Sequence, residues 1–285
     1  MSIVEQSKKS PQVSVLMPIY KTPEKYLQEA VESILNQTFT DFELLILDDC
    51  PEQPCEDIIK SYKDERIKYI KNPHNIGISA ARNALIDMAQ GKYLAILDHD
   101  DVALPKRLEK QVGFLEMHPE VGVVGTWYER FPKTKIKKQY VLNSQIERDL
   151  MQNCSILHPS SMIRKSVLLE NDIHYNGAYS PAEDYMLWLS LLGKTEFANI
   201  PEVLQKYRDH GSNTSKTQSE KMKKAADAIH RFLQEKHPDM WAKACFIKNI
   251  KLFGLPLLKY ESIGCTRKYT LFGIFKFRTR EAVKF

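Results

Sequence analysis

The sequence predicts an α/β fold in which helices cover both faces of a mainly parallel central sheet. Two observations carry this prediction. Strand-like and helix-like segments alternate five times between residues 13 and 125, as they do in chains built from β-α-β units. The strand-like segments are also near-continuous apolar runs rather than alternating ones, which is typical of strands that are buried on both faces.

The first elements set the pattern. Residues 13–17 (VSVLM) form the first predicted strand, which Pro18 ends. In residues 22–37 the apolar side chains recur at helical spacing, with Thr22 as a candidate N-cap and Pro23 at the first helical position. The further predicted strands are 42–49, 66–72, 92–97 and 121–125, and the further helices are 78–91, which Gly91 closes, and 105–118.

After residue 126 the alternation weakens. Residues 134–142 form either a strand or an exposed basic segment. The remaining expected elements are a short strand and helix in 160–171, an apolar helix in 182–193, strands in 194–200 and 203–208, and an amphipathic helix in 215–236. No clean linker interrupts them, so we expect one domain over residues 1–238 and an appendage over residues 239–285.

Composition sets limits on the class of protein. The 285 residues, 43% of them hydrophobic, suffice for one large domain with a sizeable core. No apolar run approaches the roughly 18 residues of a membrane-spanning helix, and the first residues lack the pattern of a signal peptide. The five cysteines are scattered without a C-x-x-C pair, so we expect free thiols in a reducing cytoplasm and no structural zinc site.

Charge divides the chain into two parts. The net charge is +5, but residues 240–285 hold ten Lys or Arg against two Glu, so the body is mildly acidic and the tail basic. Apolar residues in the tail recur at helical spacing from Phe246 to Leu257, although Gly254 and Pro256 oppose one continuous helix; residues 271–278 alternate like a strand. This basic amphipathic tail either packs on the domain or attaches peripherally to the anionic inner face of the plasma membrane. No nucleic-acid partner is expected, because the body is acidic and the tail lacks a recognised motif.

Acidic and polar clusters follow three of the predicted strands: PIYKT, DDC and DHDD. Ligands of open parallel sheets bind beyond the carboxyl ends of the strands, so these clusters are expected to converge. If the chain is extended there, Asp98 and Asp100 point to one side and His99 away. Two such carboxylates suit Mg²⁺ or Mn²⁺ shared with a substrate diphosphate; the alternative is a solvated acidic turn in which Asp101 caps the next helix.

The second acidic pair, Asp48 and Asp49, ends the strand at 42–49. A carboxylate at this place can accept hydrogen bonds from a nucleobase N–H or a ribose hydroxyl. The alternative is that both acids are turn residues.

Together these motifs resemble the family 2 glycosyltransferases of the GT-A fold. The resemblance runs from residue 13 to about residue 215 and rests on P-x-Y, S-I-L-x-Q-T, L-D-D, N-x-G-x-x-x-A-R-N and D-x-D-D in that order. It implies an inverting enzyme that uses a nucleotide sugar, with residues 1–238 as its catalytic domain. One departure is Cys50–Pro51, where the family usually has a small polar residue.

The resemblance also implies roles for individual residues. Pro18 and Tyr20 would border the nucleotide base, Asp49 with Asp48 would contact uracil or ribose, Arg82 and Asn83 would line the nucleotide pocket, and Asp98 and Asp100 would be the metal and ribose ligands. His210 would close over the diphosphate or the metal, or else be a structural histidine. His158 either faces the acceptor or is a satisfied loop histidine.

The reaction also needs a base that takes the proton of the acceptor hydroxyl. Glu183 and Asp184 head the predicted apolar helix, where acids also stabilise a helix dipole without any catalytic role. By the resemblance, Asp184 is the base and Glu183 contacts the acceptor or the sugar.

The implied activity is transfer of a hexose or an N-acetylhexosamine from a UDP-sugar to a glycan or glycolipid acceptor, with Mn²⁺ or Mg²⁺, as in bacterial lipopolysaccharide or lipooligosaccharide synthesis. A nucleotidyltransferase is the first alternative, but it favours a glycine-rich loop after the first strand, and MPIYKTPEKY contains no glycine. An inactive carbohydrate- or nucleotide-binding module is the second, and the retained acids argue against it.

Overall fold

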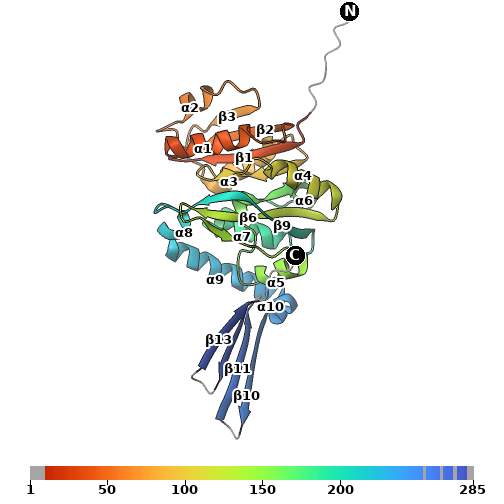
Figure 1. Cartoon of the computed structure of the whole chain (residues 1–285). Coiled ribbons are helices and arrows are strands. Elements are labelled where there is room, and N and C mark those ends of the chain that lie inside the picture. Colours follow the sequence, from red (N-terminus) through yellow and green to blue (C-terminus); the bar gives the residue numbers. More distant parts are fainter. Residues whose placement is uncertain (1–9, 253–254, 264–265, 272–274, 281–285) are drawn as a thin grey trace, which may run out of the picture.

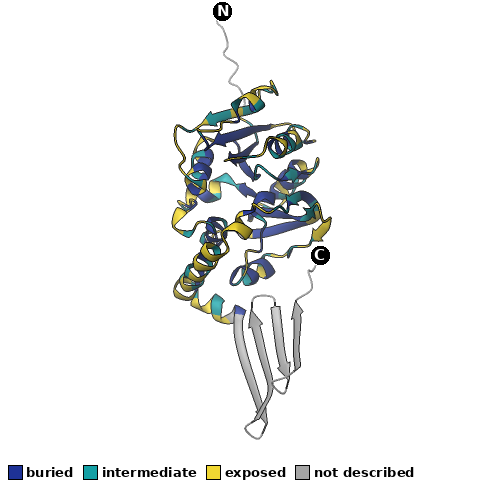
Figure 2. Ribbon diagram, turned by 90° about the vertical axis from the view of Figure 1, so that its left-hand side faces the viewer, coloured by how far each residue is buried: buried dark blue, intermediate teal, exposed yellow. Residues whose placement is uncertain are grey.

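The computed structural model describes residues 10–252, 255–263, 266–271 and 275–280, and beyond Ala244 it describes the backbone alone. A nine-stranded sheet forms the centre of the body, in the order β3-β2-β1-β4-β8-β6-β9-β5 with β7 paired to β6. Helices pack on this sheet, and Figure 2 shows buried strands inside and exposed helix faces outside. The predicted α/β class is therefore confirmed.

The first four long strands are parallel. β1 (Val13–Ile19) lies between β2 (Phe42–Asp48) and β4 (Tyr93–Ile96), and β3 (Ile67–Lys71) flanks β2. Every residue of β1, β2 and β4 is buried, as their continuous apolar runs predict. Alternate side chains enter two separate cores, because successive residues of a strand point to opposite faces.

Helices cover the two faces. α1 (Glu24–Leu35) and α4 (Arg107–Met117) pack into one core, while α3 (Ile78–Met88), α7 (Glu183–Ser190) and α9 (Ser219–Lys236) pack into the other. α1 begins one residue after Pro23 and its first turn has no side-chain cap, so the prediction that Thr22 caps it is wrong. Short elements elsewhere in the body are α2 (Glu56–Lys60), β7 (Lys135–Lys137), α5 (Asn143–Leu150), α6 (Lys165–Glu170) and α8 (Thr214–Thr217).

The second half of the sheet is mixed. β8 (Met162–Arg164) runs antiparallel to both β4 and β6 (Val121–Phe131), and β9 (Glu196–Arg208) runs parallel to β6. The two strands predicted in 194–208 are this one long strand, whose end pairs with the short edge strand β5 (Val102–Ala103). β5 lies just after the acidic DHDD segment, so its pairing brings the end of β9 to those acids.

The tail forms strands, which the alternation in its last part indicated and the helical spacing in its first part did not. α10 (Pro238–Ala244) leads into a separate antiparallel sheet of four strands: β10 (Cys245–Leu252), β11 (Leu255–Ile263), β12 (Thr266–Leu271) and β13 (Phe275–Arg280). The helical spacing from Phe246 to Leu257 is therefore a wrong guide, because these residues lie on β10 and β11 or outside the described residues. Ala244 is buried in the main core, with Met240 and Trp241 packed against it, so we propose a domain boundary after Ala244 rather than at residue 238.

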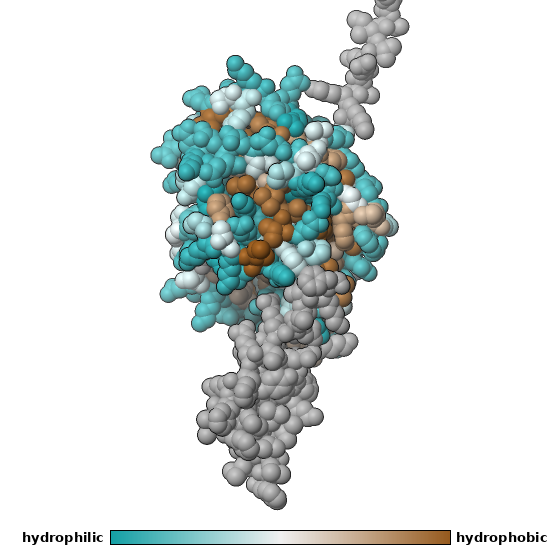
Figure 3. Space-filling view, viewed as in Figure 1, coloured by the Kyte–Doolittle hydropathy of each residue, from teal (hydrophilic) through white to brown (hydrophobic). Residues whose placement is uncertain are grey.

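Membrane attachment of the tail stays a prediction, since it concerns side chains outside the described residues. Among the described residues, no helix combines the length and apolar character needed to cross a bilayer. In the view of Figure 1, apolar residues reach the surface in the middle of the body and hydrophilic residues surround them (Figure 3). The cysteines with described side chains, Cys50, Cys55 and Cys154, are free thiols, as predicted.

Gly91 provides a test of how closely this sheet is packed. A Cβ atom at Gly91 would lie 2.5 Å from the backbone nitrogen of Ser14 in β1, whereas a Cβ atom at Gly113, inside α4, would meet nothing within 4 Å. We expect Gly91→Ala to lower the free energy of unfolding by about 1–3 kcal/mol through overpacking. Gly113→Ala should raise it by about 0.5–1 kcal/mol through helix propensity.

Equilibrium urea unfolding of both variants measures this difference. Equal effects of the two substitutions would contradict the close approach of Gly91 to β1.

Candidate active site

Three strand ends meet at a cavity of about 280 Å³, which lies beyond the carboxyl ends of the parallel strands. Its lining comes from the end of β1, the residue after β2, the start of α3 and the turn after β4: Pro18, Ile19, Tyr20, Asp49, Asn75, Gly77, Ile78, Ala81 and His99. The polar clusters that were expected to converge from distant parts of the sequence do so here.

Asp49 shapes one wall of this cavity. Its Oδ1 accepts hydrogen bonds from Nδ2 of Asn72 at 2.8 Å and from the N–H of Ile76 at 2.9 Å, and its Oδ2 accepts from the N–H of Gly77 at 2.9 Å. Gly77 has φ +81°, a left-handed conformation that glycine adopts without strain. Asp49 thus holds the loop before α3 in place while it borders the cavity.

Asp48 has a different environment. Its carboxylate accepts from the N–H groups of Cys50 at 3.0 Å and Cys55 at 2.7 Å and from the hydroxyl of Tyr69 at 2.7 Å. Asp48 is buried and does not line the cavity. In this geometry Asp48 holds the 50–55 loop, and its expected nucleotide contact stays a prediction.

The Asp98–Asp101 segment is a turn. The N–H of Asp101 donates to the carbonyl of Asp98 at 3.2 Å, so the expectation of extended backbone is wrong, and His99 lines the cavity instead of pointing away. Burial raises the pKa of Asp98, and the charge of Asp100 raises it further against the lowering effect of Arg82. The two carboxylates therefore remain close enough to repel each other.

Asp101 is a structural acid. It is buried, and its Oδ1 accepts from the N–H of Arg208 at 2.8 Å. It does not cap a helix, since α4 begins only at Arg107. Burial and the neighbouring acids, Asp100 and Asp98, raise the pKa of Asp101 well above its usual value.

A buried guanidinium joins the turn to α7. Nη1 of Arg82 donates to Oε1 of Glu183 at 2.7 Å, and Nη2 donates to Oδ1 of Asp98 at 3.2 Å. Arg82 and Glu183 are both buried. They therefore make an internal ion pair, and the direct nucleotide, sugar or acceptor contacts that the sequence predicted for them stay predictions.

Asn83 and His158 are also internal. Nδ2 of Asn83 donates to the carbonyl of Tyr175 at 2.9 Å, and Oδ1 of Asn83 accepts from the N–H of Tyr175, also at 2.9 Å. Nε2 of His158 lies 2.7 Å from the hydroxyl of Tyr175, and the histidine is buried beside Trp188. Neither residue lines the cavity, so the structural alternative for His158 fits and Asn83 fixes the Tyr175 segment.

Asp184 stands in the first turn of α7, next to this ion pair. Burial raises the pKa of Asp184 to about 6, with a further contribution from the charge of Glu183. The N–H of Tyr185 donates to its Oδ1 at 2.7 Å. A carboxylate with this pKa is mostly ionised at pH 7 and is still basic enough to accept a proton, which is the property a general base needs.

The residues that could hold a cation are two carboxylates and one imidazole. Nε2 of His210 lies 2.8 Å from Oδ2 of Asp100, and Asp98 is on the same turn. Among the described residues, no group of three or more His, Cys, Asp or Glu side chains is arranged to enclose a metal ion. Such a donor set fits a Mg²⁺ or Mn²⁺ ion that is shared with a diphosphate, and not a closed all-protein cage.

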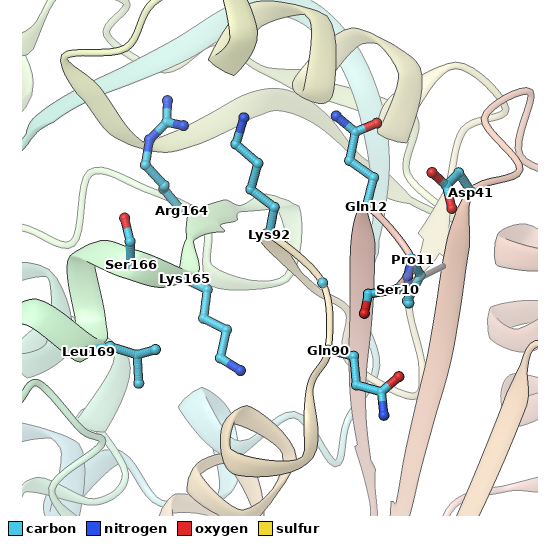
Figure 4. A pocket seen from close by; sticks show the side chains of 11 residues that line it. Ser10, Pro11, Gln12, Asp41, Gln90, Lys92, Arg164, Lys165, Ser166 and Leu169 are labelled. Atoms are coloured by element: carbon cyan, nitrogen blue, oxygen red, sulfur yellow. The ribbon is translucent and has the colours of Figure 1, made fainter. Parts of the chain in front are cut away.

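A larger hollow of about 750 Å³ lies at the opposite, amino edge of the strands (Figure 4). Its cationic side chains already have partners. Lys92 pairs with Glu116 at 2.8 Å, Lys165 donates to the carbonyl of Ala89 at 2.5 Å, and Arg164 donates to the carbonyl of Leu115 at 2.9 Å. We therefore assign the candidate site to the smaller cavity, where ionisable groups converge.

Sequence reasoning missed several contributors. Asn75 and Ile78 line the cavity, and the N-x-G-x-x-x-A-R-N motif that contains both was the available signal. Arg208, two residues before His210, was assigned no role from the sequence, although a buried arginine next to an acidic turn needs acidic partners.

Comparison with known proteins places the chain among sugar-transferring enzymes. The family model described as "Glycosyl transferase family 2" matches residues 14–171. An uncharacterized glycosyltransferase of Methanocaldococcus jannaschii is 38% identical over 207 residues, which cover 70% of this chain and 71% of that protein. The Escherichia coli UDP-Glc:alpha-D-GlcNAc-diphosphoundecaprenol beta-1,3-glucosyltransferase WfgD is 28% identical over 225 residues, which cover 78% and 87%.

Two solved structures share the fold. S. aureus TarS 1–349 in complex with UDP-GlcNAc matches with a TM-score of 0.67 at 20% identity, covering 81% of this chain and 71% of that one. The mannosyltransferase PcManGT from Pyrobaculum calidifontis, in complex with GDP-Man and Mn²⁺, matches with a TM-score of 0.56 at 14% identity, covering 82% and 73%. These likenesses confirm the GT-A fold that the sequence predicted.

His158 gives a test of the buried wall behind the site. Burial, aided by the charges of Arg82 and Arg107, holds the pKa of His158 well below its usual value. The unfolded chain takes up a proton at this residue below about pH 6.5 and the folded protein does not, so stability falls as pH drops. When the pH falls from 7 to 5.5, the free energy of unfolding of the wild type should therefore drop by about 1 kcal/mol more than that of His158→Gln.

Urea unfolding of both proteins at the two pH values measures the difference. Unfolding free energies that fall in parallel would show that His158 can be protonated in the folded protein.

Proposed function

The chain belongs to glycosyl transferase family 2, and on that basis we propose that it moves a hexose or an N-acetylhexosamine from a UDP-sugar to a hydroxyl of a glycan acceptor, with inversion at the anomeric carbon. The observation that carries this proposal is the link between the proposed base and the acidic turn. The buried Arg82 ties the first turn of α7, where Asp184 stands, to the acidic turn at the cavity.

The cavity supplies what a nucleoside needs. Tyr20 is an exposed aromatic residue on its rim, and aromatic faces stack on nucleobases without sequence preference. Asp49 and His99 offer polar atoms along the wall. The choice of UDP is supported by WfgD, whose name includes UDP-Glc as the donor, and by TarS, which was solved with UDP-GlcNAc.

Asp98, Asp100 and His210 are the residues that would hold a divalent cation beside the diphosphate. When bound, Mn²⁺ or Mg²⁺ neutralises the negative charge that develops on the departing UDP. The Mn²⁺ complex of PcManGT supports this assignment. His210 holds the carboxylate of Asp100 in place, and Arg82 holds that of Asp98.

Asp184 is the proposed general base. The acceptor hydroxyl gives its proton to this carboxylate while its oxygen forms a bond to the anomeric carbon, and the bond from that carbon to the UDP oxygen breaks. One direct displacement inverts the anomeric configuration. Glu183 acts on this step through Arg82 and through its charge, which helps to raise the pKa of Asp184.

The acceptor is proposed to be a lipid-linked glycan of a bacterial surface polysaccharide such as lipopolysaccharide. WfgD, by its name, uses an acceptor linked to diphosphoundecaprenol. An acceptor of this kind sits at a membrane, which agrees with the proposal that the enzyme is cytoplasmic and that its basic tail, with ten Lys or Arg against two Glu, attaches to the anionic inner face.

The first prediction from this function concerns the cation. EDTA should abolish release of UDP from a panel of UDP-sugars, and Mn²⁺ or Mg²⁺ should restore it, because a cation at Asp98 and Asp100 would neutralise the charge of the leaving diphosphate. Asp100→Ala should remain folded, since its removal relieves repulsion from Asp98 and Asp101, but it should lose nearly all activity. Full activity in EDTA would exclude the cation, and absence of turnover with every sugar would favour an inactive binding module.

A second prediction separates binding from chemistry. Asp184→Asn keeps the shape of the side chain and removes the base, so kcat should fall by about 10²–10⁴-fold. The affinity for UDP, measured by calorimetry, should stay unchanged. In the wild type kcat should fall as pH drops below about 6, because Asp184 then carries a proton.

The anomeric configuration of the product completes this test. Retained configuration, or a pH profile that does not change in Asp184→Asn, would contradict the assignment of the base.

A further inference from the structure

Arg208, the last residue of β9, touches the acidic turn through both its main chain and its side chain. Its N–H donates to Oδ1 of Asp101 at 2.8 Å, and its Nε donates to the main-chain carbonyl of Asp100 at 2.6 Å. The residue is buried. A buried guanidinium that binds a main-chain oxygen restrains the position of the backbone itself, and here that backbone carries the proposed cation ligand.

The guanidinium also contacts α1 and two aromatic rings. Its Nη2 pairs with Oε2 of Glu29 on α1. Its Cζ lies 4.1 Å from the ring centroid of Tyr26 and 4.4 Å from that of Phe131, so aromatic rings contact the group as well. Arg208 does not line the cavity, and its Nε and Nη2 are both directed at protein groups.

Asp100 is thus held at two points. Arg208 binds its main-chain oxygen, and His210, two residues further along the chain, lies 2.8 Å from its carboxylate. Tyr26 joins the two supports, since its ring is 5.6 Å from the ring of His210 and also contacts Arg208. The turn after β4 and the segment after β9 therefore form one unit that is anchored on α1.

We propose that Arg208 is a positioning residue that fixes the Asp98–Asp101 turn, so that the carboxylate of Asp100 is presented to a cation bound with the nucleoside diphosphate. This inference rests on the proposed function and adds to it a residue that never touches substrate. The geometry requires an arginine, because three separate directions are used at once: Nε toward Asp100, Nη2 toward Glu29, and the flat faces toward the rings. A lysine has one ammonium group and cannot reproduce this.

The test measures cation binding directly. Manganese affinity of the full chain in the presence of UDP is read from the electron paramagnetic resonance signal of free Mn²⁺. Arg208→Lys should weaken this affinity by about 10–100-fold, the usual effect of removing a residue that orients a metal ligand. The affinity for UDP without metal should not change, and excess Mn²⁺ should restore most of kcat.

Two further variants make the result interpretable. Arg66→Lys is the matched control, because Arg66 pairs with Asp64 at 2.7 Å and its Cζ lies 4.5 Å from the ring centroid of Phe42, next to β3 rather than at the acidic turn; this variant should bind Mn²⁺ like the wild type. Glu29→Gln removes the anchor of Arg208 at a partly exposed position and should weaken Mn²⁺ in the same direction, so the proposal stays testable if Arg208→Lys does not fold.

The outcomes separate the two proposals. If the wild type and Arg208→Lys bind Mn²⁺ equally in the presence of UDP, Arg208 is not a positioning residue and the proposed function stands. If Arg208→Lys loses UDP and Mn²⁺ affinity together, its role is general stability and the proposal is overturned. If the wild type binds no Mn²⁺ with UDP, both the positioning role and the proposed cation are wrong.

Discussion

The ion pair chain Glu183–Arg82–Asp98 is the interaction on which the rest of the site depends. Removing a guanidinium from water costs several kcal/mol, and only well-placed partners offset this. Arg82 has two, from elements that are far apart in the sequence: the turn after β4 and the first turn of α7. Loss of either carboxylate would leave the buried positive charge of Arg82 only partly neutralised. The two contacts therefore fix the position of α7 relative to the sheet.

A second constraint is the density of acid at one edge of the sheet. The pKa values of Asp98, Asp101 and Asp184 are all raised, first by burial and then by neighbouring carboxylates. Arg82 and main-chain N–H groups donate to these acids, and clustered like charges lower the stability of the fold. A bound cation would relieve this repulsion, which gives a physical reason for the acids to lie where a diphosphate is proposed to bind.

The alternation of strands and helices, and the edge of the sheet where the site lies, could be predicted because both follow from local patterns. Partners could not. The sequence shows two adjacent acids after β2, but only the folded loops decide that Asp48 faces the 50–55 loop and Asp49 the cavity. The roles predicted for Glu183 and Asn83 rested on family motifs alone. The partner of Glu183 is Arg82, 101 positions away, and that of Asn83 is Tyr175, 92 positions away.

Non-local pairing decides what local patterns leave open. The short strand expected in 160–171 is present as β8 (Met162–Arg164), but its antiparallel place between β4 and β6 depends on contacts that no local pattern reveals. In the tail, apolar spacing between Phe246 and Leu257 matched a helix, yet pairing along β10 and β11 determines the backbone. Helical periodicity is a weak guide where Gly254 and Pro256 interrupt the segment.

X-ray diffraction from a crystal that contains UDP and Mn²⁺, with anomalous data for manganese, tests the central claim most directly. The account predicts an anomalous peak beside Asp100 and His210, and uracil in the cavity bordered by Tyr20, Asp49 and His99. A nucleotide in the hollow at the amino edge of the strands, or a manganese ion away from Asp98 and Asp100, would contradict it.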